Sequence, residues 1–245
     1  MAIAPLVISY LIFHGTPLHD IVTKQFIIPL IILILIMLII TILVGKTQMP
    51  SIDNVRQVPG EKFDKSVWSF RNLKLGVWGI FFYVGIEVAV GANVNMYASE
   101  LGGSFASNAT HMAALYWGLL LLGRFLGSFI KQVPSEKQLV IASIGAIVLL
   151  VLAMLMANPW ILTLIGFFHS IMWPAIFTLA TDQLGKYTTK ASGVLTMGVI
   201  GGGIIPLLQG IFADVMGGNW LWTWLLVIAG EAYILYYGLN GYKQH

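Results

Sequence analysis

Residues 166 to 210 have the sequence GFFHSIMWPAIFTLATDQLGKYTTKASGVLTMGVIGGGIIPLLQG, which contains two apolar runs joined by a short polar hinge. Each run is long enough to cross a bilayer. The first is interrupted by Pro174 and the second by three glycines at 201–203 and by Pro206. Irregular backbone persists at membrane depth only where protein or a wet cavity surrounds it. Helix breakers in two consecutive spans therefore predict a cavity with movable walls, which is typical of a transport protein.

The composition indicates an integral membrane protein. Hydrophobic residues make up 58% of the 245 residues and charged residues 9%, and the mean hydropathy is +0.87. Soluble domains average about 45–50% apolar and about 25% charged residues, so the composition excludes a soluble fold. The sequence has no cysteine, which excludes a disulfide framework and a thiolate metal site.

Runs of about 20 apolar residues predict seven complete membrane-spanning helices. They lie at residues 26–45, 73–98, 109–131, 137–156, 159–184, 188–213 and 218–240. Residues 1–13 are apolar but too short to cross alone, and they lack the basic start and the cleavage site of a signal peptide. We interpret residues 1–13 as the end of a helix whose beginning is missing.

Lysine and arginine concentrate in the loops on one side of the predicted spans. They are Lys46, Arg56, Lys62, Lys65, Arg71, Lys131, Lys137, Lys186, Lys190 and Lys243, whereas the opposite loops hold only Lys24. By the positive-inside rule, this bias places residues 46–72 and the C-terminus in the cytoplasm. The net charge of +3 is then a consequence of topology, and it does not require a nucleic-acid partner.

The polar stretch 46–72 divides the chain. We expect residues 1–45 to be the remnant of an N-terminal transmembrane half, 46–72 a cytoplasmic linker, and 73–245 a C-terminal half of six helices. Six helices after a long cytoplasmic loop are the layout of the second half of a major facilitator transporter, built as two inverted three-helix repeats. The middle helix of each triplet has glycines four residues apart, which permit close helix approach in lipid. These are Gly123 with Gly127 and Gly198 with Gly202.

Several longer motifs resemble one branch of that superfamily. They are FFYVGIEVAVG (81–91), YWGLLLLGRFLGS (116–128), SIMWPAIFTLATDQLGKYTTKASG (170–193) and GVIGGGIIPLLQG (198–210). From about residue 73 to the C-terminus the sequence resembles the fucose/glucose/galactose proton symporters. The opening IAPLVISYLIF is similar to the end of that family's fifth helix. The resemblance implies an all-α membrane protein, roughly the C-terminal three-fifths of a twelve-helix sugar transporter.

The sequence also departs from the family. The superfamily signature places an Asp before a basic group, but GRFLGSFIKQVPSEK has no Asp before Lys131, so we do not assign it the usual gating role. The proton-carrying acids of the family lie in its first and fourth helices. This chain does not contain those helices, so no residue here inherits their role by motif.

The candidate substrate-binding residues are polar or aromatic side chains within the spans, namely Glu87, Asn95, Trp117, His169, Trp173 and Gln209. An ionised Glu87 at mid-span costs at least about 2.5 kcal/mol, so it must face a partner or water. It would accept a sugar hydroxyl or titrate, or else bridge helices. His169 and Trp173, one turn apart, would bind sugar by stacking and hydrogen bonding. The alternative is a histidine bonded to a neighbouring helix and a tryptophan in the core.

The remaining expectations concern Gln209, the residues Arg124 and Asp182, and Glu231. The amide of Gln209 would serve two sugar hydroxyls or bridge helices. Arg124 would form a gate ion pair with Asp182 at the same depth, with extension of Arg124 to the interface as the alternative. Glu231 lies in the last helix, which usually packs outside the transport core, so we expect a structural role.

These observations favour secondary active transport of a hexose or related sugar by alternating access. The expected partners are the sugar, the lipid bilayer and the missing N-terminal half, in a bacterial inner membrane. A proton or another cation would be the coupling ion, and we expect no other cofactor and no metal. No enzyme motif is present: the glycines of GVIGGG lie inside a span, where they cannot cradle a phosphate. A non-transporting sensor, scaffold or inactive fragment is the alternative.

Overall fold

The structure, a computed structural model, describes residues 27–46, 64–129 and 132–244, and every regular element in these ranges is helical. The chain divides into two compact units, one containing helix α2 and the other the described residues from 64 onward. The partial helix expected at 1–13, most of the expected linker, Lys24 and Lys131 lie outside the described residues.

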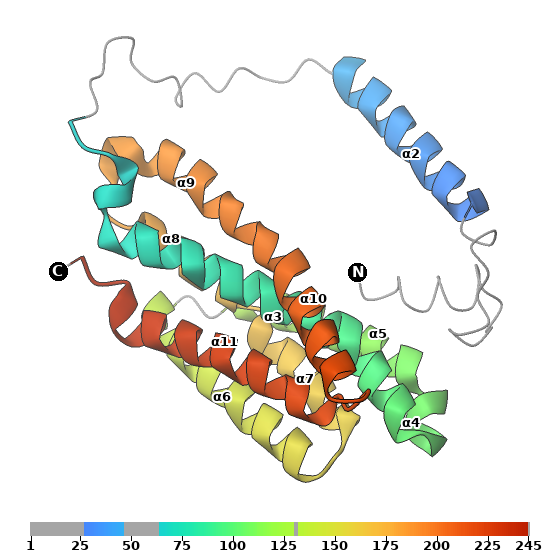
Figure 1. Cartoon of the computed structure of the whole chain (residues 1–245). Helices are drawn as coiled ribbons and strands as arrows, with labels where there is room; N and C mark the ends of the chain where they lie inside the picture. The colour runs from blue at the N-terminus through green and yellow to red at the C-terminus, as the bar shows by residue number, and fades with distance from the viewer. Residues whose placement is uncertain (1–26, 47–63, 130–131, 245) are drawn as a thin grey trace. The chain divides into compact units, whose positions relative to one another are not determined.

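Helices occupy all seven expected membrane-spanning positions (Figure 1). They are α2 (Ile27–Lys46), α3 (Arg71–Leu101), α5 (Ala109–Gly127), α6 (Ser135–Leu155), α7 (Pro159–His169) with α8 (Met172–Thr181), α9 (Thr188–Thr196) with α10 (Gly201–Val215), and α11 (Trp224–Tyr236). A short helix, α4 (Gly103–Ser107), joins α3 to α5. Within the described ranges, four helical segments are long and apolar enough to cross a membrane by length and composition: Arg71–Leu101, Ser135–Leu155, Pro159–Thr181 and Gly185–Val215.

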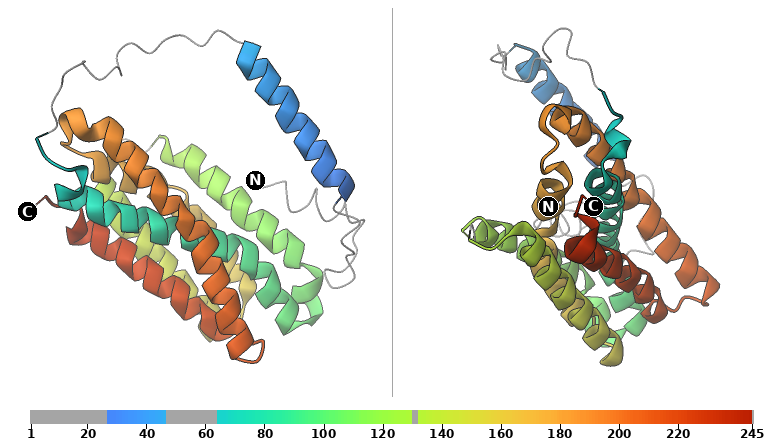
Figure 2. Two further views of the ribbon diagram at one scale, coloured as in Figure 1. Left: turned by 45° about the horizontal axis from the view of Figure 1, so that its top comes forward. Right: turned by 90° about the vertical axis from the view of Figure 1, so that its left-hand side faces the viewer.

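Helix α3 is the centre of the bundle, because it packs against α5, α7, α8, α10 and α11. Figure 2 shows α9 and α10 following one path along α3. The glycines of this path allow the backbones to approach closely. A Cβ on Gly201 would collide with the carbonyl of Phe81, and one on Gly198 would lie 2.7 Å from the carbonyl oxygen of Val77. The close approach that the glycine spacing predicts therefore occurs between α10 and α3.

The two spans that contain helix breakers differ. In the second, Gly201, Gly202, Gly203 and Pro206 lie within α10, and a short 3-10 helix at Met197–Ile200 precedes it. The first span is interrupted just before its proline. Helix α7 ends at His169 and α8 begins at Met172, since Pro174 has no N–H to donate to the carbonyl of Ser170. The hydroxyl of Tyr83, on α3, donates to the carbonyl of His169 over 3.0 Å. A side chain from the central helix thus binds the backbone at the break, as buried polar groups require.

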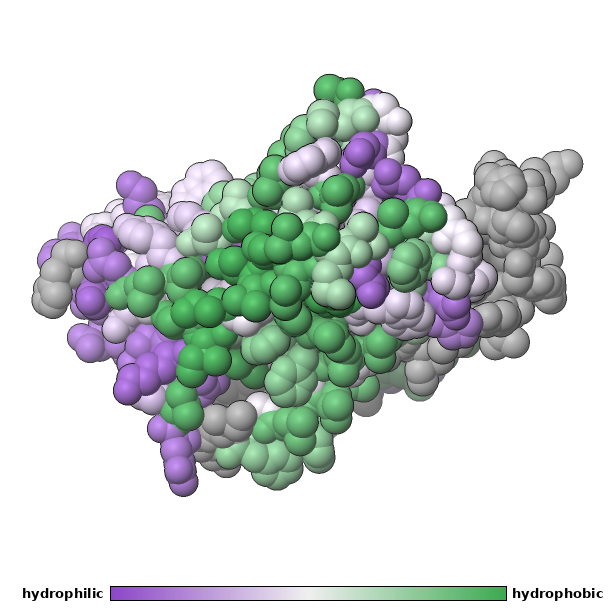
Figure 3. Space-filling model, turned by 90° about the horizontal axis from the view of Figure 1, so that it is seen from below, coloured by the Kyte–Doolittle hydropathy of each residue, from purple (hydrophilic) through white to green (hydrophobic). Residues whose placement is uncertain are grey.

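The surface of the bundle carries a broad hydrophobic band. Figure 3 shows this band across the middle of one face, with hydrophilic residues gathered toward the ends. Large apolar side chains on its helices are more than 60% exposed, including Leu121, Phe125, Ile141, Leu155 and Leu207. An apolar surface of this extent is too large for a soluble monomer and matches the hydrocarbon of a bilayer.

Candidate functional site

Glu87 and Arg124 form an ion pair between α3 and α5. The Nη2 of Arg124 donates to Oε1 of Glu87 over 3.2 Å, and the two side chains are 49% and 12% exposed respectively. The expected pair between Arg124 and Asp182 is not formed in this structure, where the acid bonded to Arg124 is Glu87. Asp182 is exposed at the end of α8, and its carbonyl accepts hydrogen bonds from Asn72 and Gln244. Equal depth along two helices did not determine which helix Arg124 faces.

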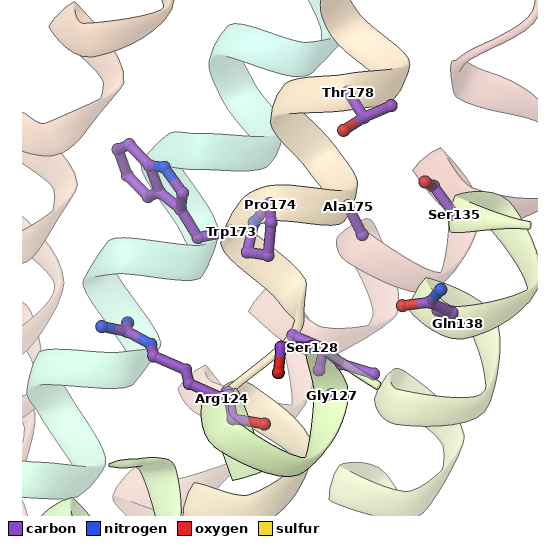
Figure 4. Close-up of a pocket in the computed structure, with 11 residues that line it drawn as sticks. Arg124, Gly127, Ser128, Ser135, Gln138, Trp173, Pro174, Ala175 and Thr178 are labelled. Atoms are coloured by element: carbon purple, nitrogen blue, oxygen red, sulfur yellow. The ribbon is translucent and has the colours of Figure 1, made fainter. Parts of the chain in front are cut away.

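Arg124 of this ion pair lines a cavity of about 600 Å³ between α5, α6 and α8, whereas Glu87 is not among the lining residues. Its polar and aromatic lining includes Arg124, Ser128, Ser135, Gln138, Trp173 and Thr178. Figure 4 shows Arg124 and Trp173 on one side and the two side chains from α6, Ser135 and Gln138, on the other. The cavity combines an indole with a guanidinium, hydroxyls and an amide, which is the combination of apolar surface and few polar groups that small polar ligands use.

His169 does not line this cavity, although the sequence placed it on the same helix face as Trp173. Its side chain is completely buried, with Nε2 2.6 Å from Oε1 of Glu231 and Nδ1 2.7 Å from the hydroxyl of Tyr116. The break after His169 separates its ring from Trp173, and the ring of Tyr83 contacts both. The structure thus gives His169 the alternative role, a histidine bonded to neighbouring helices.

Gln209 also has the alternative role that the sequence left open. It is buried on α10, accepts from Asn93 Nδ2 over 2.9 Å and donates to Thr223 Oγ1 over 3.0 Å. Its amide therefore bridges helices. Glu231 is likewise buried between helices, as its expected structural role requires, although its partner was not predicted.

Asn95 and Trp117 lie on the same two helices as the ion pair. The Oδ1 of Asn95 is buried and has no hydrogen-bond partner among the described residues. Trp117 is half-buried against Gly91, where an added Cβ would lie 2.5 Å from Cζ2 of the indole. The missing side chain at Gly91 thus makes room for the tryptophan.

Two tyrosines that the sequence patterns did not single out also contact these residues. Tyr116 and Tyr83 are fully buried, and their hydroxyls reach the carbonyls of Glu87 and His169 respectively, each over 3.0 Å. Their position in the middle of predicted spans could have indicated this role, because a buried tyrosine hydroxyl needs a hydrogen-bond partner. Among the described residues, no cluster of three or more His, Asp or Glu side chains could hold a metal ion.

Comparison with known proteins agrees with this architecture. A family model described as Major Facilitator Superfamily matches residues 1–206, more than half of the chain. The chain belongs to the major facilitator superfamily. It is therefore a multi-pass integral membrane protein of a family of transporters rather than enzymes, as the sequence predicted.

The relatives of this major facilitator chain include sugar transporters. It is 34% identical over 257 residues to a putative glucose/galactose transporter of Helicobacter pylori, covering 99% of this chain and 63% of that protein. It is 28% identical over 199 residues to the L-fucose-proton symporter of Escherichia coli, covering 77% of this chain and 45% of the symporter. The chain thus spans less than two thirds of the length of these relatives.

The fold also matches a solved member of the superfamily. A crystal structure of the transporter FucP in the outward conformation superposes with a TM-score of 0.67 at 22% identity, covering 94% of this chain and 62% of FucP. The predicted fold class, an all-α major facilitator protein, is confirmed.

Proposed function

We propose that this protein carries out secondary active transport of a hexose or related sugar by alternating access, coupled to protons. The names of its relatives support the substrate class, and one relative is a proton symporter. The observation that carries the proposal is the Glu87–Arg124 ion pair beside a cavity lined by Trp173. We expect an N-terminal helical half to form the opposite wall of the transport path.

Each group has a chemical role in this proposal. The indole of Trp173 stacks on the apolar face of a sugar ring, and the carboxylate of Glu87 accepts a sugar hydroxyl when Arg124 releases it. Arg124 is half exposed, so exchange of its partner costs little desolvation. Trp117 and the unpaired amide oxygen of Asn95 are further contacts on the same helices. Sugar binding would thus compete with the ion pair, which makes Glu87 and Arg124 a substrate-sensitive contact.

A transport assay tests this function. Membrane vesicles that contain the native protein should accumulate labelled glucose, galactose or fucose. An inward proton gradient should increase the rate of uptake. The variant Glu87→Gln should lose uptake, whereas Asp214→Asn, which alters an exposed carboxylate near the end of α10, should keep it. Absence of uptake for every hexose and amino sugar tried would refute the sugar assignment and favour a non-transporting sensor or scaffold.

The topology proposal is that residues 73–245 form one transmembrane half, with 46–72 as a linker and the C-terminus in the cytoplasm of a bacterial cell. Because the sequence has no cysteine, single cysteines can be introduced without removing others. A cysteine at Thr189 or Gln244 should be protected from an impermeant maleimide in intact cells, and one at Gly217 should react. The reverse pattern would overturn the orientation.

A further inference from the structure

The pair of His169 and Glu231 lies apart from the cavity. His169 ends α7 and Glu231 lies on α11, and both side chains are completely buried. Their nearest atoms, Nε2 and Oε1, are 2.6 Å apart. The other carboxyl oxygen of Glu231 is buried and has no partner in the described part of the chain. A titratable pair is therefore enclosed where water does not reach it.

The hydroxyl of Tyr116 limits where protons can be. It has one hydrogen, and it lies 3.0 Å from the carbonyl oxygen of Glu87 and 2.7 Å from Nδ1 of His169. If it donates to the carbonyl, Nδ1 must carry a hydrogen and donate to it. Nε2 then either donates to an ionised Glu231 or accepts from a protonated one. In both cases the pair holds one proton and has no net charge.

The alternative arrangement has Tyr116 donating to Nδ1 and a neutral His169 donating from Nε2 to Oε1 of Glu231. If Glu231 is ionised, the carboxylate has no cation. If Glu231 carries a hydrogen on Oε2, the pair again holds one proton and has no net charge. Among the described residues, the other titratable and charged groups that interact with His169 or Tyr116 are Tyr83 and Glu87 from α3 and Arg124 from α5, and Arg124 is bonded to Glu87. A buried charge without a counter-ion is strongly unfavourable, so the described surroundings favour the protonated pair.

We infer that His169 and Glu231 form a binding site for one proton, and that this proton holds the α7–α8 break in the arrangement observed. Side chains from α3, α5 and α11 bind His169 at its carbonyl, Nδ1 and Nε2. Loss of the proton removes the neutral pairing and favours separation of α11 from the end of α7. The inference does not depend on which solute the protein carries.

The number of protons released on unfolding measures whether the His169–Glu231 site holds a proton. Above about pH 6.5 an exposed histidine is neutral and an exposed glutamate is ionised, so unfolding should release the bound proton. At pH 8 the purified full chain, unfolded by denaturant in detergent, should release about one proton more than the double variant His169→Gln, Glu231→Gln. At pH 5.5 the difference should be near zero, because the exposed histidine keeps the proton. No difference at pH 8 would overturn the inference.

A second measurement needs no stable variant. Nitrogen-15 spectra of histidine-labelled protein at pH 8, with the infrared carboxyl band, determine which atoms carry hydrogen. An imidazolium with hydrogen on both ring nitrogens of His169, or a protonated carboxyl group on Glu231, supports the site. A hydrogen on Nε2 alone with an ionised Glu231 overturns it. Neither measurement uses sugar uptake, so failure here is separate from failure of the proposed function.

Discussion

Glu87 and Glu231 are both glutamates in the middle of apolar helices, but their surroundings differ. Glu87 is 12% exposed and faces a half-exposed arginine at the edge of a cavity, whereas Glu231 and His169 have no exposure. A pair that water reaches can exchange partners at low cost. A fully buried pair is stable only while it has no net charge, so loss of its proton favours separation. We therefore propose ligand exchange for the Glu87–Arg124 pair and proton binding for the His169–Glu231 pair.

The largest expected effect on stability comes from disrupting the buried His169–Glu231 pair. His169→Ala leaves a buried carboxyl group without its partner, and removal of one partner of a buried pair typically costs about 3–5 kcal/mol of unfolding free energy. Thermal or detergent unfolding of the purified chain measures this loss. A change similar to that of the exposed control Asp214→Asn would show that the pair contributes little and would remove the contrast between the two glutamates.

The Glu87–Arg124 pair should show the opposite pattern, with a small effect on stability and a large effect on transport. Glu87→Gln should change the unfolding free energy by less than about 1 kcal/mol, because its partner is half exposed. Uptake should fall by about tenfold or more, which corresponds to about 1.4 kcal/mol of lost interaction. Initial rates in vesicles, normalised to protein amount, measure the uptake. Unchanged uptake together with an unchanged pH profile would remove Glu87 from the proposed site.

Tyr116→Phe sharpens the comparison, because the Tyr116 hydroxyl lies 3.0 Å from the backbone carbonyl oxygen of Glu87 and 2.7 Å from Nδ1 of His169. Loss of a hydroxyl from a buried hydrogen bond costs about 1–3 kcal/mol when its partner remains unsatisfied. We expect a lower unfolding midpoint, together with a changed pH dependence of stability, because the Nδ1 of His169 loses its partner. Tyr236→Phe, which alters a more exposed tyrosine of α11, is the matched control. Equal effects of the two substitutions would argue against a link through Tyr116.

The smallest expected effect is that of Asp182→Asn. Arg124 bonds to Glu87, and Asn72 bonds to the backbone carbonyl of Asp182 rather than to its side chain. Loss of the Asp182 carboxylate should therefore change the uptake rate by less than about twofold. This corresponds to the free-energy change of about 0.5 kcal/mol or less that is typical of surface substitutions. Uptake rates of Asp182→Asn and Arg124→Gln, measured side by side, test this. A loss as large as that of Arg124→Gln would restore the gate pair that the sequence suggested.

Hydropathy and helix breakers determined much of this protein directly from the sequence. A run of about 20 apolar residues predicts a span wherever it occurs, and helices lie at all seven predicted positions. Pro174 predicted the break between α7 and α8 because proline lacks the N–H that a continuous helix needs. The pair Gly198 and Gly202 predicted close packing, and a Cβ there would lie 2.7 Å from the carbonyl oxygen of Val77 and 2.9 Å from Cγ1 of Val84, both on α3. These properties depend on residues near one another in the chain.

The partners of the polar side chains depended on the tertiary structure. The sequence gives the depth of Arg124 and Asp182 and the helix face of His169, but not how each helix is rotated against its neighbours. Tertiary packing turned Arg124 toward Glu87, and the break at the end of α7 turned His169 toward Glu231, 62 residues away. Hydrogen bonds and ion pairs act over about 3 Å, so only the packed bundle decides which groups meet.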